Sequence, residues 1–191
     1  SISQDNMGKF MKILMVKRLE SSFHAFKKTL ERFIHSYERF LNEYENGYVY
    51  VSKKYSNRIF ELLENDDDAA VEELITSGRA DKYAANDFKK DMETDLESDL
   101  ATLIKIKKLW EQLERDPKLL TFLKELANHP VLSKNKLIIF TESKETAEYL
   151  AKNLEKKFPS STLCFTGSSG ENVREKVIDN FDARAQRPKD D

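Results

Sequence analysis

Apolar residues recur three and four positions apart over the first quarter of the chain, a spacing that places them on one side of an α-helix. The stripe runs through Val16, Leu19, Phe23, Phe26, Leu30, Phe33, Tyr37, Phe40 and Tyr44, and Ile34 and Leu41 widen it. No proline interrupts the stripe, and Gly47 is placed to end it. The pattern predicts one long helix from Ser3 to Asn46. Its width favours packing inside a helical bundle, and a self-associating coiled coil is the alternative.

Helical spacing returns after a short β-leaning run at 48–51, which we interpret as a linker or an isolated strand. It predicts helices at 52–64 and, after Asn65 or Asp66, up to Gly78. A second long helix is expected from Asp87 to Arg115, antiparallel to the first, with its stripe at Met92, Leu96, Leu100, Leu103, Ile106, Trp110 and Leu113.

Asp116-Pro117 is typical of a helix start, and the helix predicted there ends at His129-Pro130. Residues 1–130 are therefore predicted to form an α-helical bundle.

The pattern changes at Lys136–Phe140, an apolar run without alternation, as in a strand buried on both faces. Thr141 or Ser143 can cap a following helix, whose inner side carries Ala147, Leu150, Ala151 and Leu154. A second apolar run, Thr162–Phe165, precedes a last helix with Val173, Val177, Ile178 and Phe181. This order predicts a βαβα segment with parallel strands over residues 131–191, within an α/β fold that has a dominant helical part.

These residues resemble a known family. Residues 140–147, Phe-Thr-Glu-Ser-Lys-Glu-Thr-Ala, resemble the fourth helicase motif, which opens the second RecA-like lobe of superfamily 2 helicases and SWI/SNF-type translocases. Thr166-Gly167, followed by Arg174 and Phe181, is similar to the next segment of that lobe. Residues 17–22, Lys-Arg-Leu-Glu-Ser-Ser, resemble a segment that precedes the lobe in bacterial SWI/SNF-like helicases. The resemblance implies a partial second RecA-like lobe at 131–191, with the helical bundle at 1–130 as an insertion or linker.

In such motors ATP lies between two lobes. The first lobe supplies the phosphate loop and the magnesium-binding acids, and the second supplies an arginine finger. None of the five glycines opens a Gly-x-x-x-x-Gly-Lys-Ser/Thr sequence, and Asp-Glu-x-His, Asp-Glu-x-Asp and Gln-x-x-Gly-Arg-x-x-Arg do not occur. We therefore expect a truncated piece of a motor whose parent protein binds ATP and Mg²⁺, while this piece binds neither and does not hydrolyse ATP alone.

The resemblance also implies contacts to a nucleic-acid backbone, with duplex DNA as the expected track. Such motors hold phosphates with polar groups that follow the strands, often at helix N-termini. Carried over to this chain, the contacting residues are Thr141, Ser143, Lys144, Thr166, Gly167, Ser168 and Arg174. Glu142 is unfavourable next to a phosphate. Ser143 has a competing role as a helix cap, and Arg174 can instead pair with Glu171 or Asp179 on its own helix.

Charge divides the chain unevenly. Residues 61–100 carry fourteen acids against four bases, a net charge of −10 within a chain of net charge −2. Such a segment repels a nucleic-acid backbone, so we interpret it as a solvated surface, a docking face for a basic partner, or a shield. Neither the carboxylates at 66–68 and at Asp91, Asp95 and Asp99 nor the three histidines show metal-ligand spacing, and no metal site is predicted.

The single Cys164 lies in a predicted strand, which matches core packing in a reducing, cytoplasmic protein. Short apolar runs predict no membrane contact. Two functions follow from the sequence. One is a fragment of an ATP-dependent nucleic-acid helicase or translocase that contributes second-lobe backbone contacts. The other is a non-enzymatic α-helical protein-interaction module with a small α/β part, whose partner docks on the bundle.

Overall fold

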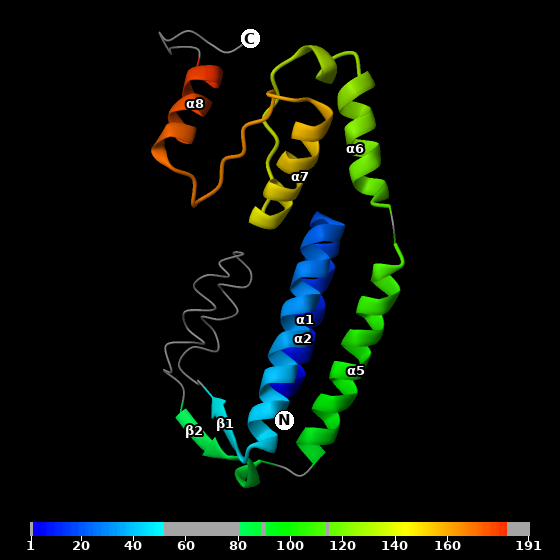
Figure 1. Cartoon of the computed structure of the whole chain (residues 1–191), viewed down its shortest axis with the longest axis vertical. Helices are drawn as coiled ribbons and strands as arrows, with labels where there is room; N and C mark the ends of the chain where they lie inside the picture. The colour runs from blue at the N-terminus through cyan, green and yellow to red at the C-terminus, as the bar shows by residue number, and fades with distance from the viewer. Residues whose placement is uncertain (1, 52–80, 89–90, 114, 183–191) are drawn as a thin grey trace. The chain divides into compact units, whose positions relative to one another are not determined.

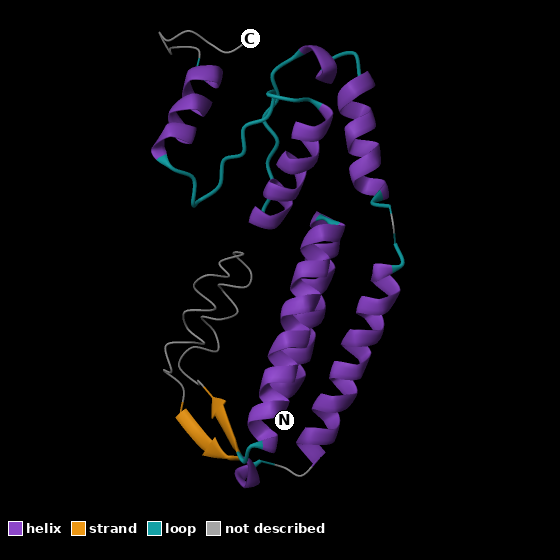
Figure 2. Cartoon of the chain, viewed as in Figure 1, coloured by secondary structure: helices purple, strands orange, loops and turns teal. Residues whose placement is uncertain are grey.

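The structure, a computed structural model, describes residues 2–51, 81–88, 91–113 and 115–182 of the chain. Most of these residues are helical (Figure 2), in α1 (Ile2–Ser21), α2 (Phe23–Glu45), α5 (Asp91–Glu111), α6 (Pro117–Asn128), α7 (Lys144–Lys157) and α8 (Glu171–Phe181). The helices expected between residues 52 and 78 lie outside the described residues.

The chain forms two compact units, Ser1–Asp116 and Pro117–Asp191, named here the first unit and the second unit. This division lies one helix before the boundary at residue 130 that the sequence suggested. The helix α6 belongs to the second unit because it packs against η2 (Leu132–Lys134) and α7.

Ser22 interrupts the helix that the sequence predicted from Ser3 to Asn46, so that prediction was wrong at this position. Its backbone is extended, with φ −159° and ψ 156°, and its side chain accepts a hydrogen bond of 3.0 Å from the Ala25 N–H, which makes it the N-cap of α2. The Tyr37 hydroxyl lies 3.7 Å from the Met11 sulfur. In one continuous helix these residues would be about 39 Å apart along the axis. The helices α1 and α2 therefore form an antiparallel hairpin, overlapping in Figure 1.

The core of the first unit lies between α1, α2 and α5, and its buried residues are Leu14, Phe26, Leu30, Phe33, Ile34 and Leu103. The ring of Trp110 lies 4.4 Å from Phe26 and 5.0 Å from Phe23, measured between ring centroids. Because the start of α2 meets the end of α5, these helices run antiparallel, as the sequence predicted. Val16, placed on the core stripe by its spacing, is 49% exposed, since α1 turns Leu14 toward the core instead.

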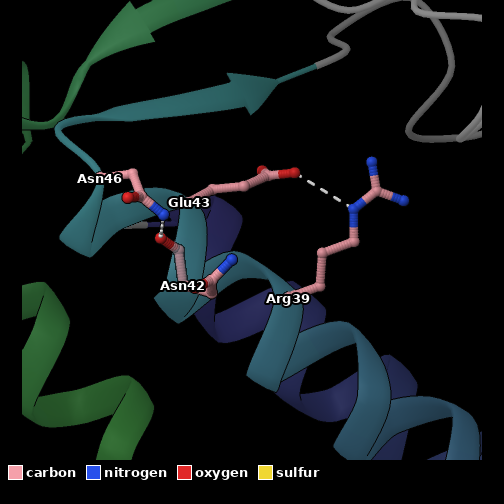
Figure 3. A network of polar contacts seen from close by, with 4 residues as sticks. All are labelled: Arg39, Asn42, Glu43 and Asn46. Carbon is pink, nitrogen blue, oxygen red and sulfur yellow. Dashed lines mark hydrogen bonds and ion pairs between the residues drawn. The ribbon is translucent and has the colours of Figure 1, made fainter.

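The end of α2 leads directly into a small sheet. Asn46 donates from its side chain to the Asn42 carbonyl at 2.7 Å, one turn away from an ion pair of 3.1 Å between Arg39 and Glu43 (Figure 3). Gly47 then adopts φ 88°, a left-handed conformation that closes the helix, so its predicted role is confirmed.

The run at 48–51 is a paired strand. β1 (Tyr48–Val51) pairs antiparallel with β2 (Asp81–Ala84) in the register Tyr48–Ala84, Val49–Tyr83, Tyr50–Lys82 and Val51–Asp81. β1 packs against α2, and Val49 is fully buried there. The 3-10 helix η1 (Ala85–Asp87) follows β2, and the Ala85 N–H donates to the Gly47 carbonyl at 3.0 Å.

The helices of the second unit follow the sequence pattern. The helix α6 begins at Pro117, α7 follows its cap Ser143, and α8 carries the last apolar set. The parallel pair of strands is not shown. Among the described residues the sheet consists of β1 and β2 alone, and Lys136–Phe140 and Thr162–Phe165 are assigned no strand.

The side chains of these two runs are more exposed than those of a strand buried on both faces. A strand buried on both faces needs neighbouring strands and covering helices. Here Phe140 is 90% exposed and Ile138 is 56% exposed, while Leu163 and Phe165 are 44% and 53% exposed. The apolar runs therefore have neither the ladder nor the cover that their composition led us to expect.

No helix in the described part of the chain combines the length and the apolarity needed to cross a membrane.

Replacing Leu30 tests the core of the first unit. Leu30 is 1% exposed, so Leu30→Ala leaves a cavity and should lower the free energy of unfolding by about 2–5 kcal/mol. The matched control Leu109→Ala removes a side chain that is 57% exposed and should change it by about 0.5 kcal/mol or less. Urea unfolding followed by the fluorescence of Trp110, the single tryptophan, measures both. Equal effects of the two changes would contradict the described core.

Tyr37 predicts a loss of stability at high pH. Burial, then the charge of Asp99 and a hydrogen bond of 3.4 Å to it, raise the pKa of Tyr37 from 10.0 to about 12. The fold favours the neutral hydroxyl, so this contribution is complete below pH 10 and is lost as the pH rises through about 12.

Absorbance titration of tyrosinate should therefore show a late component that is lost in Tyr37→Phe. Asp99→Asn should lower the pKa of Tyr37 only in part, because burial is the larger cause. A complete return to 10.0 in Asp99→Asn would contradict the burial of Tyr37.

Candidate nucleic-acid interface

The first group of candidate residues lies at the start of α7. The Ser143 hydroxyl accepts a hydrogen bond of 3.2 Å from the Thr146 N–H, and Ser143 is only 2% exposed. The Thr141 hydroxyl in turn accepts from the Ser143 N–H at 3.3 Å. Ser143 is thus committed to capping the helix, which was its competing role, and it has little surface to offer a ligand. Thr141 and Lys144 are the exposed members of this group.

The second group forms a turn in front of α8. The Thr166 N–H donates to the Ser169 hydroxyl at 2.8 Å, the Ser169 N–H donates to the Thr166 carbonyl at 3.0 Å, and the hydroxyls of Thr166 and Ser168 lie 3.2 Å apart. Gly167 and Ser168 are exposed at the tip. Gly170 is the N-cap residue of α8, and its carbonyl accepts from the Val173 N–H at 3.1 Å.

Ser169 was absent from the candidate residues, although it closes this turn. Its signal was present in the sequence, because serines and glycines in front of a helical pattern are typical of turn and cap positions.

Arg174 lies in the first turns of α8. Its guanidinium is 3.9 Å from the Glu171 carboxylate, and both side chains are mostly exposed. An exposed ion pair of this kind contributes about 0.5 kcal/mol or less, so it competes only weakly with a phosphate for the arginine.

The structure gathers the candidate residues into two places rather than one. One place, at the start of α7, holds Thr141, Ser143 and Lys144. The other, in front of α8, holds Thr166, Gly167 and Ser168, and Arg174 follows in the first turns of α8. The shared sheet edge that was to align both groups is not shown, because it required the parallel strands.

Each apolar run nevertheless contacts a helix of the second unit. The Lys136 ammonium donates to the Asn180 side chain of α8 at 3.0 Å. Burial, and then the charge of Glu148 on α7, raise the pKa of the Cys164 thiol. A raised pKa keeps the thiol protonated, which suits packing rather than a reactive thiolate.

The sequence has no phosphate loop, and among the described residues no group of three or more histidine, cysteine or acidic side chains is placed to hold a metal ion. His129, one of the three histidines, accepts two backbone hydrogen bonds at its Nδ1, from the Val131 N–H at 3.3 Å and from the Leu132 N–H at 3.4 Å. No step of ATP hydrolysis is assigned to this chain.

Comparisons with protein-family models, curated proteins and solved structures find no match for this chain. Any function is therefore inferred from the residues and from the two turns.

Replacing Ser143 tests its role as a cap. Ser143→Ala removes the acceptor of the Thr146 N–H and should destabilise α7 by about 1 kcal/mol. The control Ser161→Ala changes an exposed serine outside any helix, where we expect little effect. The rates of amide hydrogen exchange along α7 measure this loss of stability in both variants. Unchanged rates in Ser143→Ala would show that the cap is dispensable.

Proposed function

We propose that this chain is a segment of a superfamily 2 nucleic-acid helicase or translocase, related to the SWI/SNF type. In this proposal the second unit contributes backbone contacts from a second RecA-like lobe, and the first unit is a helical insertion. The chain alone carries no ATP chemistry, and ATP with Mg²⁺ belongs to the parent motor.

The observation that carries the proposal is the repeated order of elements in the second unit. Twice, an apolar run outside any helix or strand is followed by a hydroxyl-bearing turn and then by a helix, once at α7 and once at α8. A helix N-terminus with exposed hydroxyl groups suits a phosphate, because backbone N–H groups and the helix dipole favour negative charge. Lys144 and Arg174 add a positive charge to each place.

The charge distribution supports the same assignment. The strongly acidic segment 61–100 belongs to the first unit, so phosphate contacts are expected in the second unit rather than there. Glu142 is exposed beside Thr141 and weakens the first group, which makes the expected affinity low.

The alternative, a protein-interaction module, is favoured by the exposed apolar side chains of the second unit. Val131 is 58% exposed, in addition to the exposed residues of the two apolar runs. Exposed apolar groups of this kind are typical of protein contacts. In that case nucleic acid should leave both turns unaffected.

An NMR titration of the full chain with a short DNA duplex at low salt tests the proposal. We expect weak binding, with a Kd on the order of 10⁻⁴ M or weaker. The shifted amides should be those of 141–145 and 166–174, and the shifts should disappear as salt is added.

A charge-matched pair of variants sharpens this experiment. The double variant Lys144→Ala with Arg174→Ala should reduce the slope of log Kd against log salt concentration by about 2, since each phosphate contact contributes about 0.9 to that slope. Lys152→Ala with Lys176→Ala removes two exposed lysines from the same helices, away from the turns, and should leave it unchanged. Equal losses in both variants, shifts outside the turns, or binding insensitive to salt would contradict the proposal.

A further inference from the structure

The connection between α1 and α2 is a single residue. α1 ends at Ser21 and α2 begins at Phe23. The Ser22 N–H still donates to the Arg18 carbonyl at 3.0 Å, and the Ser22 carbonyl accepts from the Phe26 N–H at 3.1 Å, as in a continuous helix. Rotation of Ser22 alone into helical φ and ψ would bring the amides of 23–25 to the carbonyls of 19–21. One residue thus separates the hairpin from an uninterrupted helix.

Five buried residues on the two sides of this turn share one face of that uninterrupted helix. They follow each other at spacings of four, four, three and four residues, in the order Leu14, Arg18, Ser22, Ala25 and Thr29. The larger buried residues of α2, Phe26, Leu30, Phe33 and Ile34, lie further round the helix. A straightened helix therefore keeps these five residues in one continuous buried stripe. In that form α1 points away from the α2 of its own chain, and its buried side needs the α2 of another copy.

We propose that α1 exchanges between two copies of this chain. In the resulting dimer Ser22 is helical, the two long helices run antiparallel, and each α1 packs on α2 of the other copy. Met11 of one copy then contacts Tyr37 of the other copy. The two-fold axis therefore lies near residue 24, midway between positions 11 and 37 of each chain. Two of the buried residues next to this crossing are small, Ser22 (4% exposed) and Ala25 (fully buried), while the larger Phe26, 6% exposed, is as close to it as Ser22.

Exchange of α1 should cost little free energy, because it keeps the core contacts and changes only the conformation of the turn. Short connections of this kind are known to favour swapping of an element between copies. The Ser22 cap opposes it, since its hydrogen bond to Ala25 exists only in the hairpin. The cap is therefore the residue that sets the balance between monomer and dimer.

Ser22→Ala tests the role of the cap. Loss of the cap should shift the equilibrium at each turn about fivefold toward the uninterrupted helix. Because the dimer contains two such turns, its dissociation constant should fall on the order of 25-fold. The control Ser36→Ala makes the same change at an exposed position within α2 and should have no comparable effect. Light scattering after chromatography, on chains refolded over a range of concentrations, measures the constant.

Cross-linking identifies the geometry of the dimer. In a Cys164→Ser background, chains with Met11→Cys are refolded together with chains carrying Tyr37→Cys and treated with a short bismaleimide. Exchange predicts a covalent product of twice the 22.3 kDa chain mass. One chain carrying both cysteines is the control for reactivity, because it can link within the monomer. Four residues, Gly-Ser-Gly-Ser, inserted after Ser22 should abolish the product by relaxing the turn.

Two results would overturn the proposal. One is that the wild-type chain and Ser22→Ala both stay monomeric after refolding at high concentration. The other is that dimers form without the link between positions 11 and 37 of different chains, which would place the interface elsewhere. Should Ser22→Ala fail to fold, the cross-linking of the cysteine variants that keep Ser22 and the variant with the lengthened turn decide the matter alone.

Discussion

Ser22 turns the chain back on itself, and the core of the first unit exists because α1 then lies against α2. The energies involved are unequal. Burial of one large apolar side chain such as Leu14 or Leu30 is worth about 1.5–3 kcal/mol, whereas an N-cap is worth about 1 kcal/mol. The hydrogen bond from Ala25 to Ser22 therefore does not hold the core together. It selects which of two arrangements with nearly the same core the chain adopts.

Local rules predicted most of the helical fold. The spacing of apolar residues located α5, α6, α7 and α8, and a left-handed glycine ended α2 as expected. The same spacing could not reveal the turn at Ser22, because apolar residues three and four positions apart continue across it through Leu19, Phe23 and Phe26, and neither proline nor glycine marks the break. β2, Asp-Lys-Tyr-Ala, lacks an apolar alternation and is defined only by its pairing with β1, which lies some thirty residues earlier.

The candidate site also contains one part that local sequence rules predicted and another part that they did not. Capping by Ser143 was foreseeable, because it depends on residues three positions apart. The two apolar runs were expected to be strands from composition alone, yet a strand also requires a neighbour that supplies hydrogen bonds. With Phe140 and Phe165 exposed, the runs keep the composition of buried strands without the surroundings of one.

The charge of α5 has a structural explanation that narrows where nucleic acid is expected to bind. Five of its six acids lie in the first half, from Asp91 to Asp99, its lysines lie in the second half, from Lys105 to Lys108, and Glu111 ends the helix. This order complements the helix dipole, which favours acids in the first turn and bases in the last. Asp99 also accepts a hydrogen bond from Tyr37. The acids of α5 thus need no docking partner to account for them, yet they still repel phosphate. A backbone contact is therefore expected where a helix N-terminus coincides with a positive side chain, as at Lys144 and Arg174.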